Sequence, residues 1–199
     1  EAANNLITEM QTTIKQVDTS TIKAWIVDLR KNMGGNMWPM LTGIGPVLGN
    51  GLAGKFVDAD SVVTNWYYTD GISSVDGHYI HCFTNYYILK NPNPFVAVLT
   101  DNYTGSSGEA IVVSFRGRQK TRSFGINTMG RSTANKAFIL SDGAKLFLTV
   151  ATMADRNGVL YGKKIVPDEN IKGIFKTNPL DNDEVVNAAI NWIENVSKK

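Results

Sequence analysis

The chain has 199 residues and a formal net charge of +2, and 43% of its residues are hydrophobic while 19% are charged. This length favours one domain, and this composition allows a substantial buried core. The net charge is too small to argue for nucleic acid or an anionic membrane as a partner, and no apolar run approaches the ~20 residues that cross a bilayer. The single cysteine, Cys82, excludes an intrachain disulfide.

Hydrophobic periodicity predicts alternating helices and strands in the first half of the chain. Residues 1–17 are expected to form a helix with one apolar face, made by Leu6, Ile7, Met10, Ile14 and Val17. A strand at 22–29, a helix at 37–48 and short strands near 54–58, 62–68 and 78–88 are then expected.

The second half continues the same alternation. We expect a strand at 95–100, a helix at 107–117, and short strands near 121–124, 136–140 and 145–151. A last helix is expected after the cap Asp181, with Val185, Ala188, Ala189, Trp192 and Ile193 on one face. Buried strands that alternate with helices predict an α/β domain.

A serine lies at a glycine-bracketed turn between a predicted strand and a predicted helix. The apolar run 95–99 leads into the segment TGSSGE at 104–109. The hydroxyl of Ser106 on such a turn is exposed, with the N–H groups of the helix behind it. Ser106 is therefore a candidate nucleophile, although small residues before a helix are also typical of a plain N-cap.

A glycine pair, Gly34 and Gly35, follows the predicted strand at 22–29. Without a Cβ, the backbone there can approach a ligand closely and turn its N–H groups outward. If both loops lie at the same ends of neighbouring strands, an N–H of Gly34 or Gly35 and that of Ser107 would form an oxyanion hole. The competing interpretation of the glycine pair is a tight turn into a helix.

Five short motifs, in order along the chain, resemble those of the C-terminal processing (tail-specific) serine peptidases. They are Asp-Leu-Arg-x-Asn-x-Gly-Gly at 28–35, Ser-x-x-Glu at 106–109, Gly-x-x-Thr-x-Gly at 125–130, Leu-x-Asp-Gly at 140–143, and Pro-Asp at 167–168 after a short strand. The resemblance covers most of the chain. It implies the fold shared with the Clp protease and crotonase group, a repeated β-β-α superhelix, and cleavage through an acyl-enzyme on Ser106.

The sequence departs from the family at the general base. Many members place a lysine where this chain has Arg131, and arginine stays protonated at any physiological pH. Arg131 therefore cannot accept a proton from Ser106, and we expect it to bind a backbone carbonyl or the terminal carboxylate of a peptide substrate. Lys136 could substitute only if the register of its strand moved.

One branch of the family, the archaeal tricorn core and the nisin-resistance proteases, resolves this conflict. Members of this branch use a histidine base from an upstream segment, and their nucleophile motif resembles residues 106–109 of this chain. We therefore expect residues 1–199 to be a catalytic core that lacks an upstream segment. The base of a Ser-His mechanism would come from that segment or from a second copy in a homo-oligomer.

Two other functions stay open. Loss of the lysine also fits an inactive binding module for peptides or apolar ligands, as in the repeats of the vertebrate interphotoreceptor retinoid-binding protein. A crotonase-like acyl-CoA enzyme would have a similar oxyanion hole, but the Ser-x-x-Glu and Pro-Asp motifs argue against it. We favour a serine peptidase that acts on peptides or C-terminal tails, with no nucleic-acid partner and an extracellular or cell-envelope location in a bacterium.

The remaining charged and ligating residues are interpreted structurally. No cofactor or metal is expected, because His78 and His81 lack the further ligands that a metal needs. Asp28 and Arg30 are expected to pair with each other, and Glu109 to offset the dipole of the helix at its first turn. The basic cluster of Arg116, Arg118, Lys120 and Arg122 is expected to be a solvated face.

Overall fold

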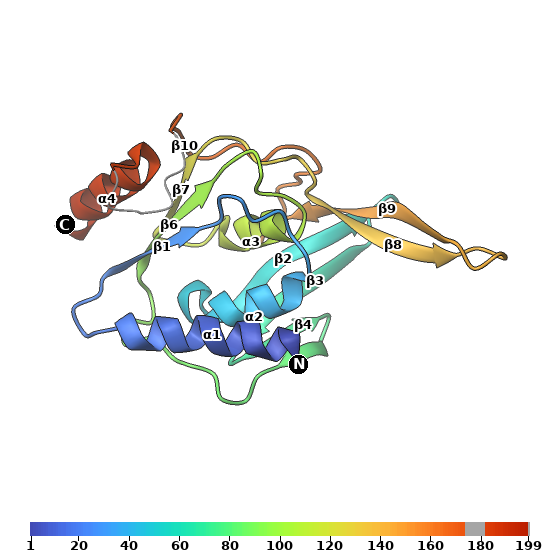
Figure 1. The fold of residues 1–199 in the computed structure, drawn as a ribbon, viewed down its shortest axis with the longest axis horizontal. Helices are drawn as coiled ribbons and strands as arrows, with labels where there is room; N and C mark the ends of the chain where they lie inside the picture. Colours follow the sequence, from blue (N-terminus) through green and yellow to red (C-terminus); the bar gives the residue numbers. More distant parts are fainter. Residues whose placement is uncertain (174–181, 199) are drawn as a thin grey trace.

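The structure of the chain, a computed structural model, describes residues 1–173 and 182–198 (Figure 1). Two sheets form its framework. The parallel sheet has the order β1-β6-β7-β10, with β1 at Ala24–Asp28, β6 at Phe95–Thr100, β7 at Thr121–Gly125 and β10 at Glu169–Asn170. The antiparallel sheet has the order β5-β4-β3-β2-β9-β8, with β2 at Gly51–Asp58, β3 at Val63–Thr69, β4 at Ile72–Val75, β5 at His78–Cys82, β8 at Thr133–Ile139 and β9 at Lys145–Ala154.

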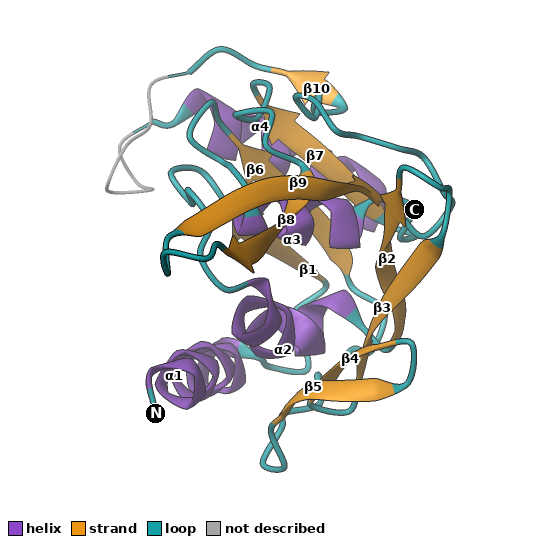
Figure 2. Cartoon of the chain, turned by 90° about the vertical axis from the view of Figure 1, so that its right-hand side faces the viewer, coloured by secondary structure: helices purple, strands orange, loops and turns teal. Residues whose placement is uncertain are grey.

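In the part of the chain that the structure describes, four helices cover these sheets: α1 at Ala2–Val17, α2 at Met37–Leu48, α3 at Ser107–Phe115 and α4 at Glu184–Ser197. Figures 1 and 2 show α3 between the two sheets, α2 beside it, and α1 outside α2. The main core joins α2, α3 and both sheets, whereas α4 packs on the opposite face of the parallel sheet in a separate cluster around Leu99, Phe124 and Val185. The predicted α/β class is confirmed.

The register of the parallel sheet determines where the two candidate loops lie. Strand β1 pairs with β6 in parallel, with Val27 opposite Val98. The carboxyl ends of both strands therefore meet at one edge of the sheet, where β1 leads to the glycine pair and β6 leads to Ser106. This is the arrangement expected from the two glycine-rich strand exits.

The strand predicted at 78–88 begins correctly at His78 but ends at Cys82, and the strand before it, at 72–75, was not predicted. Residues 72–75 and 78–82 form an antiparallel hairpin, β4–β5, because Asp76 and Gly77 make a tight turn with φ of +43° and +83°. After Cys82 the chain leaves the sheet, and the Tyr87 N–H donates to the side chain of Gln11 on α1. The segment around Asp76 and Gly77 has few apolar residues, so these two residues are only a weak sign of a turn between two strands. The first strand of the hairpin, β4, was therefore missed in the sequence analysis.

Three smaller predictions also need correction. Leu6 and Val17 are 36% and 51% exposed, so the buried face of α1 is narrower than predicted. The N-cap of α4 is Asp183, whose carboxylate accepts from the N–H groups of Val185 and Val186. The predicted cap, Asp181, lies outside the described residues. The Pro-Asp pair at 167–168 precedes the short strand β10 and does not follow a strand.

The hairpin β8–β9 projects from the body of the molecule (Figure 1) and is longer than predicted. Its two strands pair from Thr133 with Thr152 to Ile139 with Lys145. Large apolar side chains on it are exposed, including Ile139 at 75% and Phe147 at 66%. The Leu-x-Asp-Gly motif forms the tip of this hairpin, where the Leu140 N–H donates to the Ala144 carbonyl.

Two members of the basic cluster, Arg116 and Arg118, are not the solvated side chains that the sequence suggests, whereas Lys120 is exposed as expected. Arg116 pairs with Asp168 at 2.7 Å, and Arg118 is partly buried and donates to the backbone carbonyls of Leu48 and Pro94. Burial, together with repulsion by Arg156, lowers the pKa of Arg118 to about 10. These arginines join loops of the fold, since their guanidinium groups satisfy carbonyl oxygens that no helix or sheet uses.

Asp168 is expected to make the stability of the fold pH-dependent. Burial raises its pKa, but hydrogen bonds from Ser123 and the charge of Arg116 outweigh burial, so its pKa lies below the ordinary value of 3.8. A carboxyl with a depressed folded pKa stabilises the fold above its unfolded pKa, and loses this contribution as the pH falls through the folded pKa.

Replacement Asp168→Asn should therefore lower the unfolding free energy by about 1 kcal/mol at pH 7, a modest effect because solvent screens a half-exposed carboxylate. The gap from wild type should narrow as the pH falls below 3.8. Urea unfolding of both proteins across that range measures this gap. A gap that is the same at every pH would contradict the assignment.

Candidate active site

Ser106 occupies a strained position between β6 and α3. Its φ is +52° and its ψ is −119°, which non-glycine residues rarely adopt. Such a backbone conformation costs about 1–3 kcal/mol and persists only where surrounding contacts hold it, most often at functional sites. Ser106 is partly exposed. A serine hydroxyl presented in this way at the start of a helix can attack an electrophilic carbon.

The neighbouring Ser107 has a different role. Its side chain is only 8% exposed, and its hydroxyl donates to the backbone carbonyl of Gly35 at 2.7 Å. This bond ties the start of α3 to the glycine loop. Of the two adjacent serines, Ser106 is therefore the one whose hydroxyl does not bond to the glycine loop, and it is also the N-cap of α3, in a capping box with Glu109.

The glycine loop lies directly against Ser106. A Cβ placed on Gly34 would stand 2.9 Å from the Cβ of Ser106 and 2.9 Å from the backbone nitrogen of Ser107. Only glycine fits this contact, and Gly34 and Gly35 also have φ of +107° and +132°. The prediction that the two glycine-rich loops meet in space is confirmed.

The two glycines of this loop differ in whether their N–H groups are hydrogen-bonded. The Gly34 N–H donates to Oδ1 of Asn32 at 3.1 Å and is therefore occupied. Among the described residues, neither the N–H of Gly35 nor that of Ser107 has a hydrogen-bond partner. Asn32 also accepts from the Gly105 N–H through its backbone carbonyl at 2.9 Å, so one residue orients both loops.

Glu109 connects the nucleophile loop to the Gly-x-x-Thr-x-Gly loop. Its carboxylate is completely buried, and Oε2 accepts from the Ser106 N–H at 2.9 Å and from the Arg131 N–H at 2.7 Å. Oε1 accepts from the Thr128 hydroxyl at 2.5 Å and the Gly130 N–H at 2.9 Å. With four donors the carboxylate is fully engaged, so its geometry suits positioning and not proton transfer.

The sequence predicted only the helix position of Glu109, and missed this bridge. The only sign in the sequence is that the Ser-x-x-Glu and Gly-x-x-Thr-x-Gly motifs both occur in the chain. No adjacent residue indicates that the Glu109 carboxylate binds both motifs. The contact joins residues about twenty positions apart through tertiary packing.

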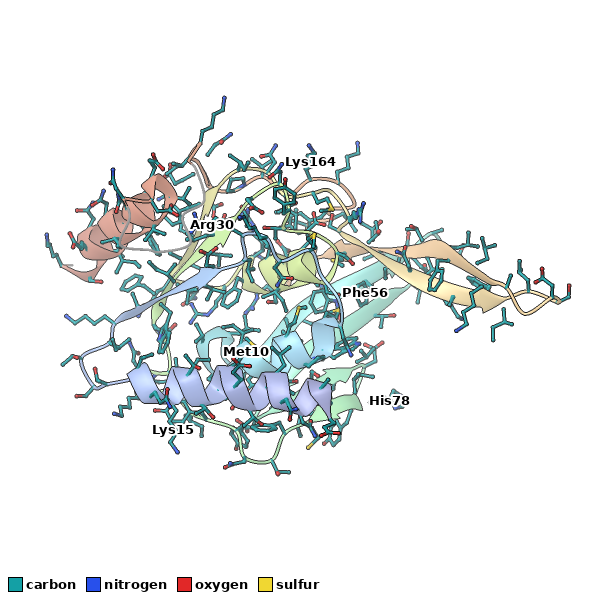
Figure 3. All side chains as sticks on the ribbon, in the orientation of Figure 1. Met10, Lys15, Arg30, Phe56, His78 and Lys164 are labelled. Carbon is teal, nitrogen blue, oxygen red and sulfur yellow. The ribbon has the colours of Figure 1, made fainter. Side chains whose placement is uncertain are left out.

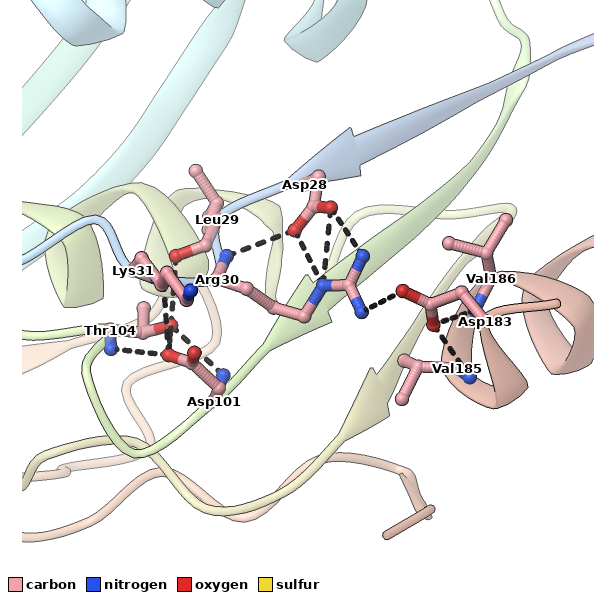
Figure 4. Close-up of polar contacts among 9 residues, drawn as sticks. All are labelled: Asp28, Leu29, Arg30, Lys31, Asp101, Thr104, Asp183, Val185 and Val186. Carbon is pink, nitrogen blue, oxygen red and sulfur yellow. Dashed lines mark hydrogen bonds and ion pairs between the residues drawn. The ribbon is translucent and has the colours of Figure 1, made fainter. Parts of the chain in front are cut away.

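Two further contacts support the strand exits (Figure 4). Oδ1 of Asp101 accepts from the N–H groups of Lys31, Tyr103 and Thr104. The Thr104 hydroxyl donates to the Leu29 carbonyl at 2.9 Å. These bonds join the loop after β1 to the loop after β6 and so fix the position of Ser106 relative to the glycine pair.

The expected Asp28–Arg30 pair is present and extends further. The guanidinium of Arg30 donates to Asp28 at 2.7 Å and to Asp183, the cap of α4, also at 2.7 Å (Figure 4). Burial alone would lower the pKa of Arg30, but the bonds and charges of the two carboxylates outweigh it and raise the pKa. Arg30 is therefore a structural ion-pair residue that attaches α4 to the end of β1.

The basic side chains named in the sequence analysis lie in different parts of the molecule. Arg131 brings its backbone N–H to Glu109, while its side chain is exposed. Lys136 is on the projecting hairpin with its Nζ 5.6 Å from the ring centre of Phe138. His78 and His81 are on β5, where His81 shares a hydrogen bond with Asn4 of α1 (Figure 3 labels His78). The structure does not bring Lys136 or the histidines together with Ser106.

One lysine that the sequence analysis overlooked, Lys164, lies beside the Gly-x-x-Thr-x-Gly loop. Its Cγ would be 3.0 Å from a Cβ on Gly130. The Ile165 N–H next to it donates to the Thr128 hydroxyl. Lys164 itself is exposed. Within residues 1–173 and 182–198, no group of three His, Cys, Asp or Glu side chains is placed to hold a metal ion.

A strained serine at a strand-to-helix turn, beside the unpaired N–H groups of Gly35 and Ser107, is the arrangement of a serine hydrolase. The sequence pattern of peptidase family S41 matches residues 3–171, and the chain belongs to that family. By family and fold it is therefore a peptidase S41 domain, the family that the five motifs indicated.

Similar proteins agree with this class. The nisin-resistance protein of Lactococcus lactis subsp. lactis is 34% identical over 174 residues, which cover 87% of this chain and 50% of that protein. A lipoprotein of Streptococcus agalactiae has a similar structure, with a TM-score of 0.72 and 24% identity over 98% of this chain and 61% of the other. The photosystem II D1 C-terminal processing protease has a TM-score of 0.62 and 18% identity, over 84% and 39% of the two chains.

The chain thus spans about half the length of the curated relative that it matches. The two solved structures show a shared fold, which confirms the fold expected from the family resemblance. Among the helices that the structure describes, none is long and apolar enough to span a membrane.

Proposed function

We propose that this chain is the catalytic core of a peptidase in which Ser106 attacks the carbonyl carbon of a peptide bond. A general base takes the hydroxyl proton as the Ser106 Oγ–C bond forms, this proton passes to the amine as the C–N bond breaks, and water then hydrolyses the acyl-enzyme. The developing oxyanion would accept hydrogen bonds from the N–H groups of Gly35 and Ser107. The observation that supports this most is the strained backbone of Ser106 beside these two unpaired donors.

Gly34 then acts as a spacer. Because its N–H already donates to Asn32, the oxyanion donor in the glycine loop is Gly35 and not Gly34. A side chain at position 34 would push Ser106 and Ser107 away from the loop.

We further propose that the general base comes from outside these 199 residues, as a histidine in a further segment of the protein or in a second copy. Arg131 cannot take this role, because a guanidinium does not lose its proton at physiological pH. Glu109 cannot take it either, since four donors already use its oxygens.

The 199-residue chain alone is therefore expected to hydrolyse peptides very slowly, since removal of a general base typically costs ~10²–10⁴-fold in rate. Hydrolysis of a quenched fluorescent peptide by this chain, and by any longer protein that contains it, measures the difference. Rapid turnover by the chain alone that disappears in Ser106→Ala would place the base within it. In that case Lys164→Met, with Lys163→Met as the matched control, tests the lysine beside Gly130.

Arg131 is proposed to bind the terminal carboxylate of the substrate, because its side chain is exposed while its N–H is fixed beside Ser106 through Glu109. We expect Arg131→Ala to weaken binding of a peptide with a free C-terminus about tenfold, and to leave binding of the amidated peptide unchanged. Fluorescence anisotropy measures both affinities. Equal losses for the two peptides would contradict a carboxylate contact.

Arg131→Lys is not expected to create a Ser-Lys enzyme. A lysine base needs an apolar pocket that lowers its pKa, and this position is exposed and followed by Ser132 and Thr133. A gain of peptide hydrolysis in this variant would show that position 131 is a latent base.

Peptides or proteins are the proposed substrates, and a bacterial cell envelope or its exterior is the proposed location. The support is that one relative is a nisin-resistance protein and one similar structure is a lipoprotein. The other candidate, an inactive module that binds peptides, is favoured only by Arg131 in the lysine position. Peptide binding with no reactivity of Ser106, even when a base is supplied, would support it.

A further inference from the structure

Three of the six methionines contact the loops that carry Ser106 and the glycine pair. Met33 precedes Gly34 and is 66% exposed. Met40 places its Cε 3.6 Å from the position of a Cβ on Gly35. Met129 places its Sδ 3.0 Å from the position of a Cβ on Gly105, the residue before Ser106. Three methionines from three separate segments therefore lie in or beside the two loops that carry the candidate nucleophile and the glycine pair.

A cavity of about 340 Å³ lies behind one of these methionines. It lies among α1, α2, β1 and α3, and its apolar lining includes Met10, Ile14, Trp25, Met40, Ile44 and Ile111. Met40 and Asn32 form part of its wall, and Sδ of Met40 lies 3.9 Å from Nδ2 of Asn32. Because Asn32 also bonds to Gly34 and Gly105, the cavity adjoins the loops of the site.

Met40 packs against the main core, but core packing does not account for Met33. Met37 and Met153 are core residues, with 8% and 3% exposure. Met33, in contrast, exposes two thirds of its side chain in the loop that must approach a substrate. A methionine is unbranched and polarizable, so it adapts to apolar groups of different shape at little cost.

We propose that Met33, Met40 and Met129 form an adaptable apolar subsite for the side chain of a residue next to the scissile bond. A large apolar side chain, such as leucine or phenylalanine, enters between them, and Met40 changes rotamer to admit it into the cavity. The substrate class is therefore a peptide with an apolar residue at the cleavage point. That this residue lies at the cleavage point rests on the proposed function of Ser106. Binding of the peptide's apolar side chain between the methionines does not require catalysis.

Methionine footprinting with hydrogen peroxide tests the subsite in the Ser106→Ala chain. The probe is a blocked hexapeptide of alanines with one central leucine, and the control peptide carries aspartate at that position. Mass spectrometry gives the rate at which each thioether becomes a sulfoxide. Met153, which is buried away from the loops, reports whether the fold stays intact.

The leucine peptide is expected to slow the oxidation of Met33, Met40 and Met129 at least threefold, roughly the change of a site that is mostly occupied. The aspartate peptide should have no effect. Met40→Leu, which keeps shape and polarity, should preserve the slowing at Met33 and Met129, and Met40→Gln should abolish it. Equal slowing by both peptides, or by neither, overturns the proposal.

This result is independent of the peptidase assay. Footprinting that succeeds while Ser106 of the wild-type protein proves unreactive would reject the proposed function and retain the apolar subsite. If Ser106 reacts but the leucine peptide does not slow methionine oxidation, the proposed function is retained and the apolar subsite is rejected.

Discussion

Glu109→Gln is expected to be the most damaging conservative replacement in the chain. The glutamine amide would put an NH₂ group against N–H donors that now bond to a carboxylate oxygen, in a position with no exposure to solvent. A buried donor that faces another donor costs about 1–3 kcal/mol, and loss of bonds to a charged group adds a similar amount. We expect a loss of about 3 kcal/mol in unfolding free energy by urea titration.

The same replacement should slow covalent labelling of Ser106 by a fluorophosphonate about 100-fold, because the N–H of Ser106 and the loop at Gly130 lose their common acceptor. Glu194→Gln on the exposed surface of α4 is the matched control, and should leave both stability and labelling unchanged. Glu109→Asp should recover part of the stability if the carboxylate charge matters. Near-native labelling in a folded Glu109→Gln protein would show that Glu109 does not position Ser106.

Gly34→Ala is expected to have the second largest effect. The new Cβ would stand 2.8 Å from the Gly105 carbonyl oxygen and 2.9 Å from Ser106 Cβ, distances at which the backbone must move. A shift of about 1 Å at a reacting group can cost roughly 100-fold in rate. Labelling of Ser106 should fall by this factor, and a crystal structure of the variant should show the two loops further apart.

Gly51→Ala is the control that separates the effect of the steric contact at position 34 from the effect of backbone strain at positive φ. Gly51 has a similar φ of +128°, but a Cβ there would meet nothing within 4 Å. Both variants should therefore lose about 1 kcal/mol or more from strain at positive φ, while only Gly34→Ala loses labelling. Equal labelling in the two variants would contradict the role of Gly34 as a spacer.

The sequence predicted those parts of the site that depend on local chemistry. A buried strand followed by glycines, or by a serine and a helix, is recognisable from adjacent residues alone. Parallel pairing of β1 with β6 then brings the two exits together, as expected for neighbouring strands of an α/β sheet.

The parts that the sequence analysis missed depend on tertiary packing. That Glu109 would accept from Thr128, Gly130 and Arg131 follows from how α3 packs against a loop that lies later in the chain. That the N–H of Gly34 is occupied follows from one rotamer of Asn32. Arg116 and Arg118 were misread for the same reason, because a charged run carries no sign of which carbonyls it will meet.

The central claim is that Ser106 and its oxyanion donors are already formed in this chain, and that only the base is missing. Imidazole can stand in for that base, so the most direct measurement is fluorophosphonate labelling of the 199-residue chain at increasing imidazole concentration, followed by peptide mass spectrometry. We predict a single adduct on Ser106 that forms faster as imidazole rises and is absent from Ser106→Ala. Labelling of another residue, or no adduct on Ser106 in a folded chain at any imidazole concentration, would contradict the claim.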